Sequence, residues 1–203
     1  MSDEPRPEVD LAASPELTEA TVALAERVNA VLRAHRVEAL LIGGLALAVH
    51  GYVRSTEDLD LGVATSIQQM QAVHAQLVAA GFNALIRESD GNDPLGGVID
   101  VDGPAGEAVQ IVNFDNSPTQ GLPIAIKEAL AQVGPEGADG RLRVIPVPHL
   151  IALKVYATMS GAAAERARRD VQELLRLNPD VNVEEVRALC KRYRLNLDRL
   201  LNS

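Results

Sequence analysis

Two aspartates, Asp58 and Asp60, stand two residues apart in a segment that alternates polar and apolar side chains, a pattern typical of a β-strand. Successive strand side chains point to opposite faces, so both carboxylates lie on one face and Leu59 and Leu61 on the other. Neighbouring carboxylates repel each other, and a divalent cation relieves that repulsion. Mg²⁺ favours one or two protein carboxylates together with phosphate oxygens. The pair therefore predicts a magnesium site that works with a phosphate-bearing ligand.

Two glycines, Gly43 and Gly44, precede the aspartates and follow an apolar segment, 37–42, that indicates a buried strand. Residues 45–50 suit a short helix, which Gly51 closes. Backbone N–H groups at such a turn can meet phosphate closely, because glycine has no Cβ to block the approach. A strand, a diglycine turn, a helix and a second strand with paired aspartates together predict a phosphate cradle beside a metal platform.

Three charged side chains outside this unit are candidates for the same site. Lys154 stands in an otherwise apolar helical pattern, so it either extends to solvent or is directed at a charged ligand such as a triphosphate. Arg54 either contacts phosphate or pairs with Glu57. Asp170 follows a cluster of arginines, where a surface ion pair is the simplest role.

These motifs resemble the minimal nucleotidyltransferase superfamily, whose signature is a Gly-Gly or Gly-Ser turn followed by Asp-x-Asp or Asp-x-Glu. The form GG-L-A-x-x-x-H-G-x-x-R-x-T-x-D-L-D-L is similar to the AbiEii-type branch, known from toxin–antitoxin and phage-abortive systems. Residues 150–157 resemble its L-I-A-L-K-x-x-A helix. Residues 166–175 resemble its R-x-K-D-x-x-D-L helix, with Arg169 in place of the lysine and Glu173 in place of the second aspartate. The resemblance covers residues 37–176, and the motifs come in the family's order.

The resemblance implies an enzyme that moves a nucleoside monophosphate from a Mg²⁺-bound nucleoside triphosphate (NTP) to an acceptor hydroxyl. The implied site residues are Gly43, Gly44, Arg54, Asp58, Asp60, Lys154 and Asp170. The paired aspartates hold Mg²⁺, and the glycines and the two cations meet the phosphates. The last aspartate is either a general base or the partner that orients the lysine. The acceptor is an RNA 3′ end, a protein or a small molecule.

The resemblance also admits a toxin role with a cognate antitoxin as partner. The alternative is a catalytically weak or inactive nucleotide-binding module of such a pair.

Polymerase-type members of the superfamily place a third carboxylate on a later strand, where this chain has Gln110. Asp100 or Asp102 replaces it if the hairpin brings them near Asp60. Otherwise these two aspartates are turn-forming residues at a hairpin end. Without a third carboxylate, acceptor activation falls to Asp170, or the protein binds nucleotide without turning it over.

The remaining elements follow from periodicity and capping residues. Ser14 and Pro15 predict the start of a helix that ends near His35, and Thr65 or Ser66 the start of one that ends near Ala80. Strands are expected at 83–87, 98–101, 108–114 and 142–147, and helices at 124–133, 149–160, 162–177, 183–193 and 196–201. The fold class is therefore α+β, a nucleotidyltransferase-like mixed β-sheet flanked by helices. We expect a disordered tail at 1–13, the α/β core at 14–147 and a helical C-terminal part at 148–203.

Composition narrows the partners. The net charge of −9 disfavours indiscriminate nucleic-acid binding, and few aromatic side chains are available for base stacking. Residues 141–203 hold 12 Lys and Arg against 7 Asp and Glu, so an anionic partner or a solvated basic face belongs there. No apolar run approaches the ~20 residues that cross a bilayer, so no membrane partner is expected. The single cysteine and the lack of a secretory pattern indicate a cytoplasmic protein.

Overall fold

The computed structural model describes residues 19–56, 58–89, 95–115, 122–134, 142–159 and 164–201. The expected tail, the helix start at Ser14 and the side chain of Glu57 lie outside these ranges. A five-stranded sheet with the order β1-β2-β5-β4-β3 forms the centre. Its strands are β1 (Ala39–Ile42), β2 (Leu59–Val63), β3 (Asn83–Arg87), β4 (Val98–Asp102) and β5 (Ala108–Asn113). The sheet is mixed, because β2 and β5 run parallel and the other neighbours antiparallel.

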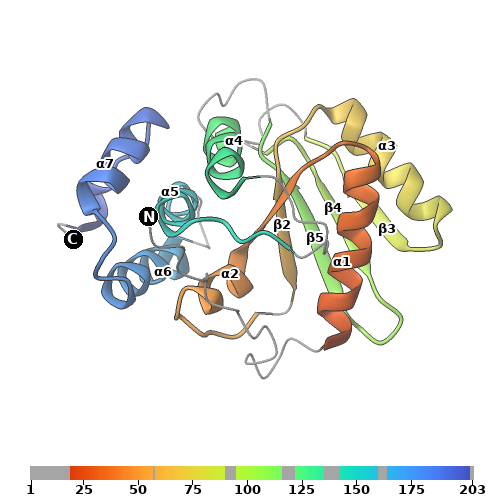
Figure 1. The fold of residues 1–203 in the computed structure, drawn as a ribbon, viewed down its shortest axis with the longest axis horizontal. Helices are drawn as coiled ribbons and strands as arrows, with labels where there is room; N and C mark the ends of the chain where they lie inside the picture. Colours follow the sequence, from red (N-terminus) through yellow and green to blue (C-terminus); the bar gives the residue numbers. More distant parts are fainter. Residues whose placement is uncertain are drawn as a thin grey trace, which may run out of the picture.

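Helices flank the sheet on both sides (Figure 1). On one side lie α1 (Glu19–Ala34) and α3 (Ile67–Ala79), which contact β5 and β3 respectively. On the other side lie α2 (Gly43–Val49), α4 (Leu122–Val133) and α5 (Val147–Ala157). The C-terminal helices α6 (Ala164–Leu177) and α7 (Val183–Arg192) pack against α5, and α8 (Asp198–Leu201) follows. The expected α+β class and helical C-terminal part are confirmed.

The alternation in β2 has the expected structural result. Leu59 and Leu61 are fully buried in the core, while Asp60 lies on the opposite face of the sheet. The helix after β2 starts where a cap was expected, because the Ser66 side chain accepts a hydrogen bond from the backbone N–H of Gln69. Local sequence therefore sets both the strand that carries the aspartate and the turn that leaves it.

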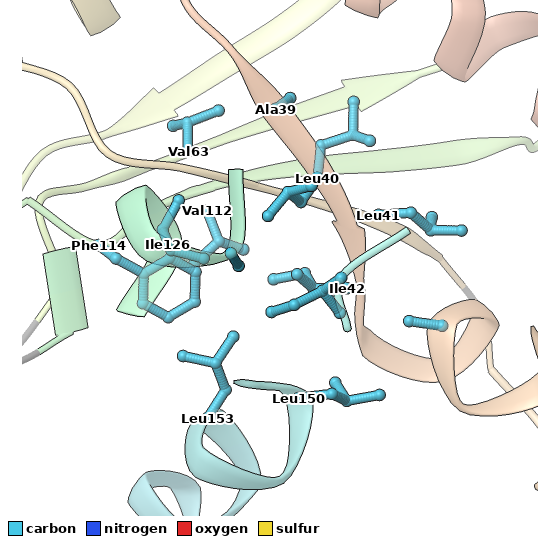
Figure 2. Close-up of a cluster of buried hydrophobic side chains, with 14 of the residues drawn as sticks. Ala39, Leu40, Leu41, Ile42, Val63, Val112, Phe114, Ile126, Leu150 and Leu153 are labelled. Atoms are coloured by element: carbon cyan, nitrogen blue, oxygen red, sulfur yellow. The ribbon is translucent and has the colours of Figure 1, made fainter. Parts of the chain in front are cut away.

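Helix α5 is fixed on the sheet by apolar contacts (Figure 2). Its Leu150 and Leu153 belong to the cluster formed by Leu40 and Ile42 of β1 with Ile126 of α4. Burial of each leucine contributes about 1.5–3 kcal/mol. The cluster runs from the sheet into the C-terminal helices without a break, so the packing ties this helical part closely to strand β1.

The prediction of a strand at 142–147 is wrong. A single parallel bridge joins Val144 to Leu41, and α5 already begins at Val147. Pro146 precedes that helix, and Pro148 lies in its first turn. Proline has no backbone N–H to donate to a neighbouring strand but is well suited to the first turn of a helix. The two prolines thus end the extended segment early.

Candidate functional site

The diglycine turn and the paired aspartates form one packed unit. Ile42 and Asp60 are direct partners across β1 and β2, so Gly43 begins α2 beside the Asp60 side chain. Gly43 has φ +67°, and a Cβ placed there would lie 1.7 Å from Oδ2 of Asp60. A Cβ on Gly44 would lie 2.6 Å from Thr56. Both positions therefore require glycine, the first for its backbone conformation and both for space.

Asp60 lies in an environment that disfavours its charge. Burial raises the pKa of the Asp60 carboxyl to about 7, and the Asp58 carboxylate adds to the rise. The positive charges of Lys154 and Arg54 and a hydrogen bond from the backbone N–H of Gly44 act in the opposite direction. Lys154 and Arg54 are thus close enough to act on Asp60 although they come from distant parts of the chain.

A buried carboxylate joins these two cations. The side chain of Asp170, on α6, is 1% exposed. Its Oδ1 accepts a hydrogen bond from Arg54 Nε at 3.1 Å, and its Oδ2 lies 3.3 Å from Arg54 Nη2 and 2.9 Å from Lys154 Nζ. Arg54 and Lys154 remain 19% and 15% exposed. The bidentate geometry fixes the guanidinium, and the shared oxygen fixes the ammonium beside it.

The packing of the helices explains this meeting. Lys154 follows Leu153, which lies in the cluster between α5 and the sheet, and α5 packs directly against α6. On α6, the buried residues Ala167, Asp170, Val171 and Leu174 share one side of the helix, so the carboxylate faces inward. From the sequence, Arg54 was expected to contact phosphate or to pair with Glu57. Neither expectation included Asp170, which lies 116 residues away in the chain.

Thr56 is a residue that the sequence reasoning missed. Its hydroxyl lies 3.1 Å from the backbone oxygen of Asp58 and 3.4 Å from Asp58 Oδ1, and its side chain fills the space beside Gly44. Thr56 therefore links the loop before β2 to both motifs. The threonine between the diglycine turn and the aspartate pair was the sequence feature that could have identified it.

Asp60 begins a row of polar side chains across the sheet. Gln110 of β5 is the direct partner of Asp60 on β2 and of Asp100 on β4. The side-chain amide of Gln110 donates to Asp100 Oδ1 at 2.8 Å, and Arg87 forms an ion pair with Asp100 at 2.8 Å. Asp102 lies two residues further along β4 than Asp100, and its Oδ2 accepts a hydrogen bond from the side-chain amide of Asn83 at 3.0 Å. Both candidate replacements for the third carboxylate are thus bound to other side chains.

The side chains present at Asp58 and Asp60 fit a magnesium ion. Their carboxylates lie close enough to act on each other, and burial and the charge of Asp58 together raise the pKa of Asp60, so a cation bound there would stabilise the charged form of Asp60. Among the described residues, no group of three His, Cys, Asp or Glu side chains gathers closely enough to hold a metal. Of the described residues, Asp58 and Asp60 are thus the two carboxylates that the site offers to a cation.

No family model matches the sequence, and no curated protein matches it either. Solved structures do match. The antibiotic-resistance factor ANT(2'')-Ia in solution superposes with TM-score 0.55 at 16% identity, over 92% of this chain and 96% of that one. The crystal structure of ANT(2'')-Ia in complex with adenylyl-2''-tobramycin gives TM-score 0.53 at 16% identity, over 86% and 97% of the two chains. An antigenic nucleotidyltransferase-like protein from Paracoccidioides brasiliensis gives 0.50 at 13%, over 92% and 98%.

The chain has the nucleotidyltransferase-like fold. The match spans nearly the whole length of each of these three proteins, so the likeness includes the C-terminal helices as well as the sheet. At 13–16% identity it is a likeness of fold. Among the described helices, none is both long and apolar enough to cross a membrane.

Proposed function

We propose that this protein transfers a nucleoside monophosphate from a Mg²⁺-bound NTP to an acceptor hydroxyl. The observation that carries the proposal is the convergence of two fixed cations, Arg54 and Lys154, on the aspartate pair beside the diglycine turn. Carboxylates for a cation and cations for phosphates, side by side, form the arrangement that phosphoryl chemistry needs. Enzymes catalyse phosphoryl transfer mostly by positioning the reactants and by stabilising charge.

In this proposal each side chain has one task. Asp58 and Asp60 hold Mg²⁺, which when bound supplies positive charge to the phosphate oxygens. Lys154 and Arg54 bind the triphosphate and stabilise the negative charge that builds up as pyrophosphate leaves. Gly43 lets the Asp60 carboxylate sit against the turn, since any side chain there would displace it.

Asp170 is a positioning residue in this scheme. A general base needs a free oxygen within reach of the acceptor hydroxyl. Both oxygens of Asp170 are taken by Arg54 and Lys154, and the side chain is buried. Of the two roles that the sequence left open, these contacts support the one in which Asp170 orients Lys154.

The test is transfer of labelled NTP in the presence of Mg²⁺. Acceptors to be offered are total RNA, a cell lysate and hydroxyl-rich small molecules, among them amino sugars, because ANT(2'')-Ia was solved with an adenylylated tobramycin. We expect labelled product from wild type and a loss of more than about 100-fold in Asp58→Ala and Asp60→Ala, the scale of removing a charge-stabilising group. Asp102→Ala removes an equal charge from the same sheet and retains activity. Measurable NTP binding without Mg²⁺-dependent transfer would instead support the nucleotide-binding module.

A toxin role is a finer proposal, supported by the AbiEii-like motif pattern. Induced expression of the wild-type chain in a bacterial host should then arrest growth, and Asp60→Ala should relieve the arrest. Normal growth with soluble wild-type protein would exclude this role and leave the transfer reaction in place.

A further inference from the structure

The amide of Gln110 has a fixed direction. Its Nε2 donates to Oδ1 of Asp100 at 2.8 Å, and a carboxylate can only accept, so the amide nitrogen must face β4. The carbonyl oxygen, Oε1, is therefore turned away from Asp100. The neighbour of Gln110 on the other side is Asp60, because the two residues are direct partners across β5 and β2. The Asp60 side of Gln110 thus offers an uncharged oxygen.

Asp100 cannot replace a third carboxylate while this arrangement holds. Arg87 binds its Oδ2 through Nε at 2.8 Å and its Oδ1 through Nη2 at 3.0 Å. Two strand spacings, about 10 Å, separate Asp100 from Asp60, and side chains stand perpendicular to a sheet rather than converging across it. Arg87 and Asp100 instead form a support that holds the amide of Gln110.

We propose that Gln110 occupies the third-ligand position as a neutral oxygen donor and that the site consequently takes one divalent cation rather than two. This inference rests on the proposed function. Two cations in such a site lie about 3.5–4 Å apart and need negative charge between them. Of the described side chains, only Asp58 and Asp60 offer the ions negative charge, and Lys154 and Arg54 add positive charge beside them, of which Asp170 offsets one unit. A second ion would therefore have to be held by the triphosphate alone. An amide oxygen coordinates a cation without offsetting the repulsion between two.

The number of bound ions tests the proposal directly. Mn²⁺ replaces Mg²⁺ as a probe, and electron paramagnetic resonance reports the free Mn²⁺ in a titration of the protein with a non-hydrolysable NTP. The Mn²⁺ held by nucleotide that is not bound to protein is subtracted. In wild type we then expect a total of one Mn²⁺ per complex of chain and nucleotide. In Gln110→Asp, which restores a carboxylate, we expect two.

Two alanine variants test the support. Asp100→Ala frees the amide of Gln110, so the Mn²⁺ dissociation constant should rise about tenfold, as for other residues that orient metal ligands. Asp102→Ala removes the same charge from the same strand without touching Gln110, and it should leave the constant unchanged. Thermal unfolding of each variant establishes that it is folded before the titration.

The outcomes separate this proposal from the one on which it rests. Two Mn²⁺ in wild type would overturn the single-cation inference and leave the transfer reaction standing. A single Mn²⁺ in Gln110→Asp, or an unchanged constant in Asp100→Ala, would overturn the role of Gln110. No bound Mn²⁺ in wild type would overturn the inference together with the metal site of the proposed function.

Discussion

Replacing Asp170 by asparagine tests the ion network at the centre of the site. The substitution keeps the shape of the side chain but removes the negative charge that Arg54 and Lys154 share. Breaking a buried ion pair costs about 3–5 kcal/mol, because the remaining charge stays desolvated. Since both cations keep 15–19% of their side-chain surface exposed, we take the lower end, about 3 kcal/mol. For a chain of this length that loss lowers Tm by about 6–12 °C.

Urea unfolding in metal-free buffer measures the loss, and Glu173→Gln is the matched control. Glu173 lies on the same helix and also pairs with an arginine, Arg176, at 2.7 Å. The Arg176 side chain is 66% exposed and that of Glu173 29%, so water screens the pair and its removal should change stability by less than about 1 kcal/mol. Asp170→Asn should also weaken Mg²⁺-NTP binding in a calorimetric titration, while the control binds normally. A stability loss below about 1 kcal/mol in Asp170→Asn would refute the buried network as a source of stability.

Three further perturbations follow. Gly43→Ala should abolish Mn²⁺ binding, measured by titration, because the new Cβ would lie 1.7 Å from Oδ2 of Asp60; unchanged affinity would contradict the close packing. In metal-free buffer between pH 4 and 7, the folded chain holds a proton on Asp60 that the unfolded chain has already lost, because the pKa of Asp60 rises from 3.8 to about 7 on folding. Stability should therefore fall as pH rises through that range, by at most about 4 kcal/mol. Thermal unfolding against pH should show this slope in wild type and a flatter one in Asp60→Asn; equal slopes would refute it. Leu153→Ala should cost about 2–5 kcal/mol in urea unfolding and weaken NTP binding, whereas Leu201→Ala at an exposed site should do neither.

Periodicity and capping residues were sufficient to predict most elements of the fold. Alternation in β2 identified the face that carries Asp60, and the helical spacing around Lys154 identified the helix α5, although not its packing on the sheet. The error at 142–147 arose because apolar residues indicate burial, while Pro146 and Pro148 at the C-terminal end of the segment favour the start of a helix over a longer strand. Local pattern therefore succeeds where the pattern itself determines the structure.

Contacts between distant residues were not predictable from local pattern. Arg54 had two plausible partners in the sequence, and the structure supplies a third, Asp170, through the packing of α5 against α6. From the sequence, Gln110 was recognised only as the position where a third carboxylate is missing. The orientation of its amide depends on Asp100 and Arg87 from neighbouring strands, so predicting that orientation required the sheet register as well as the residue type.

The contact between Gly43 and Asp60 also limits how this protein can evolve. Any side chain at position 43 enters the space of the Asp60 carboxylate, although the two positions lie on different elements. The effect of one substitution thus depends on the residue at the other. Gly43→Ala should do less additional harm once Asp60 is shortened to alanine, because the clash with the carboxylate is gone, although the positive φ of residue 43 and the Cβ of residue 60 at 2.9 Å still oppose it. A double-mutant cycle should give a strongly non-additive result for this pair. Random mutagenesis that retains function should therefore leave both residues unchanged.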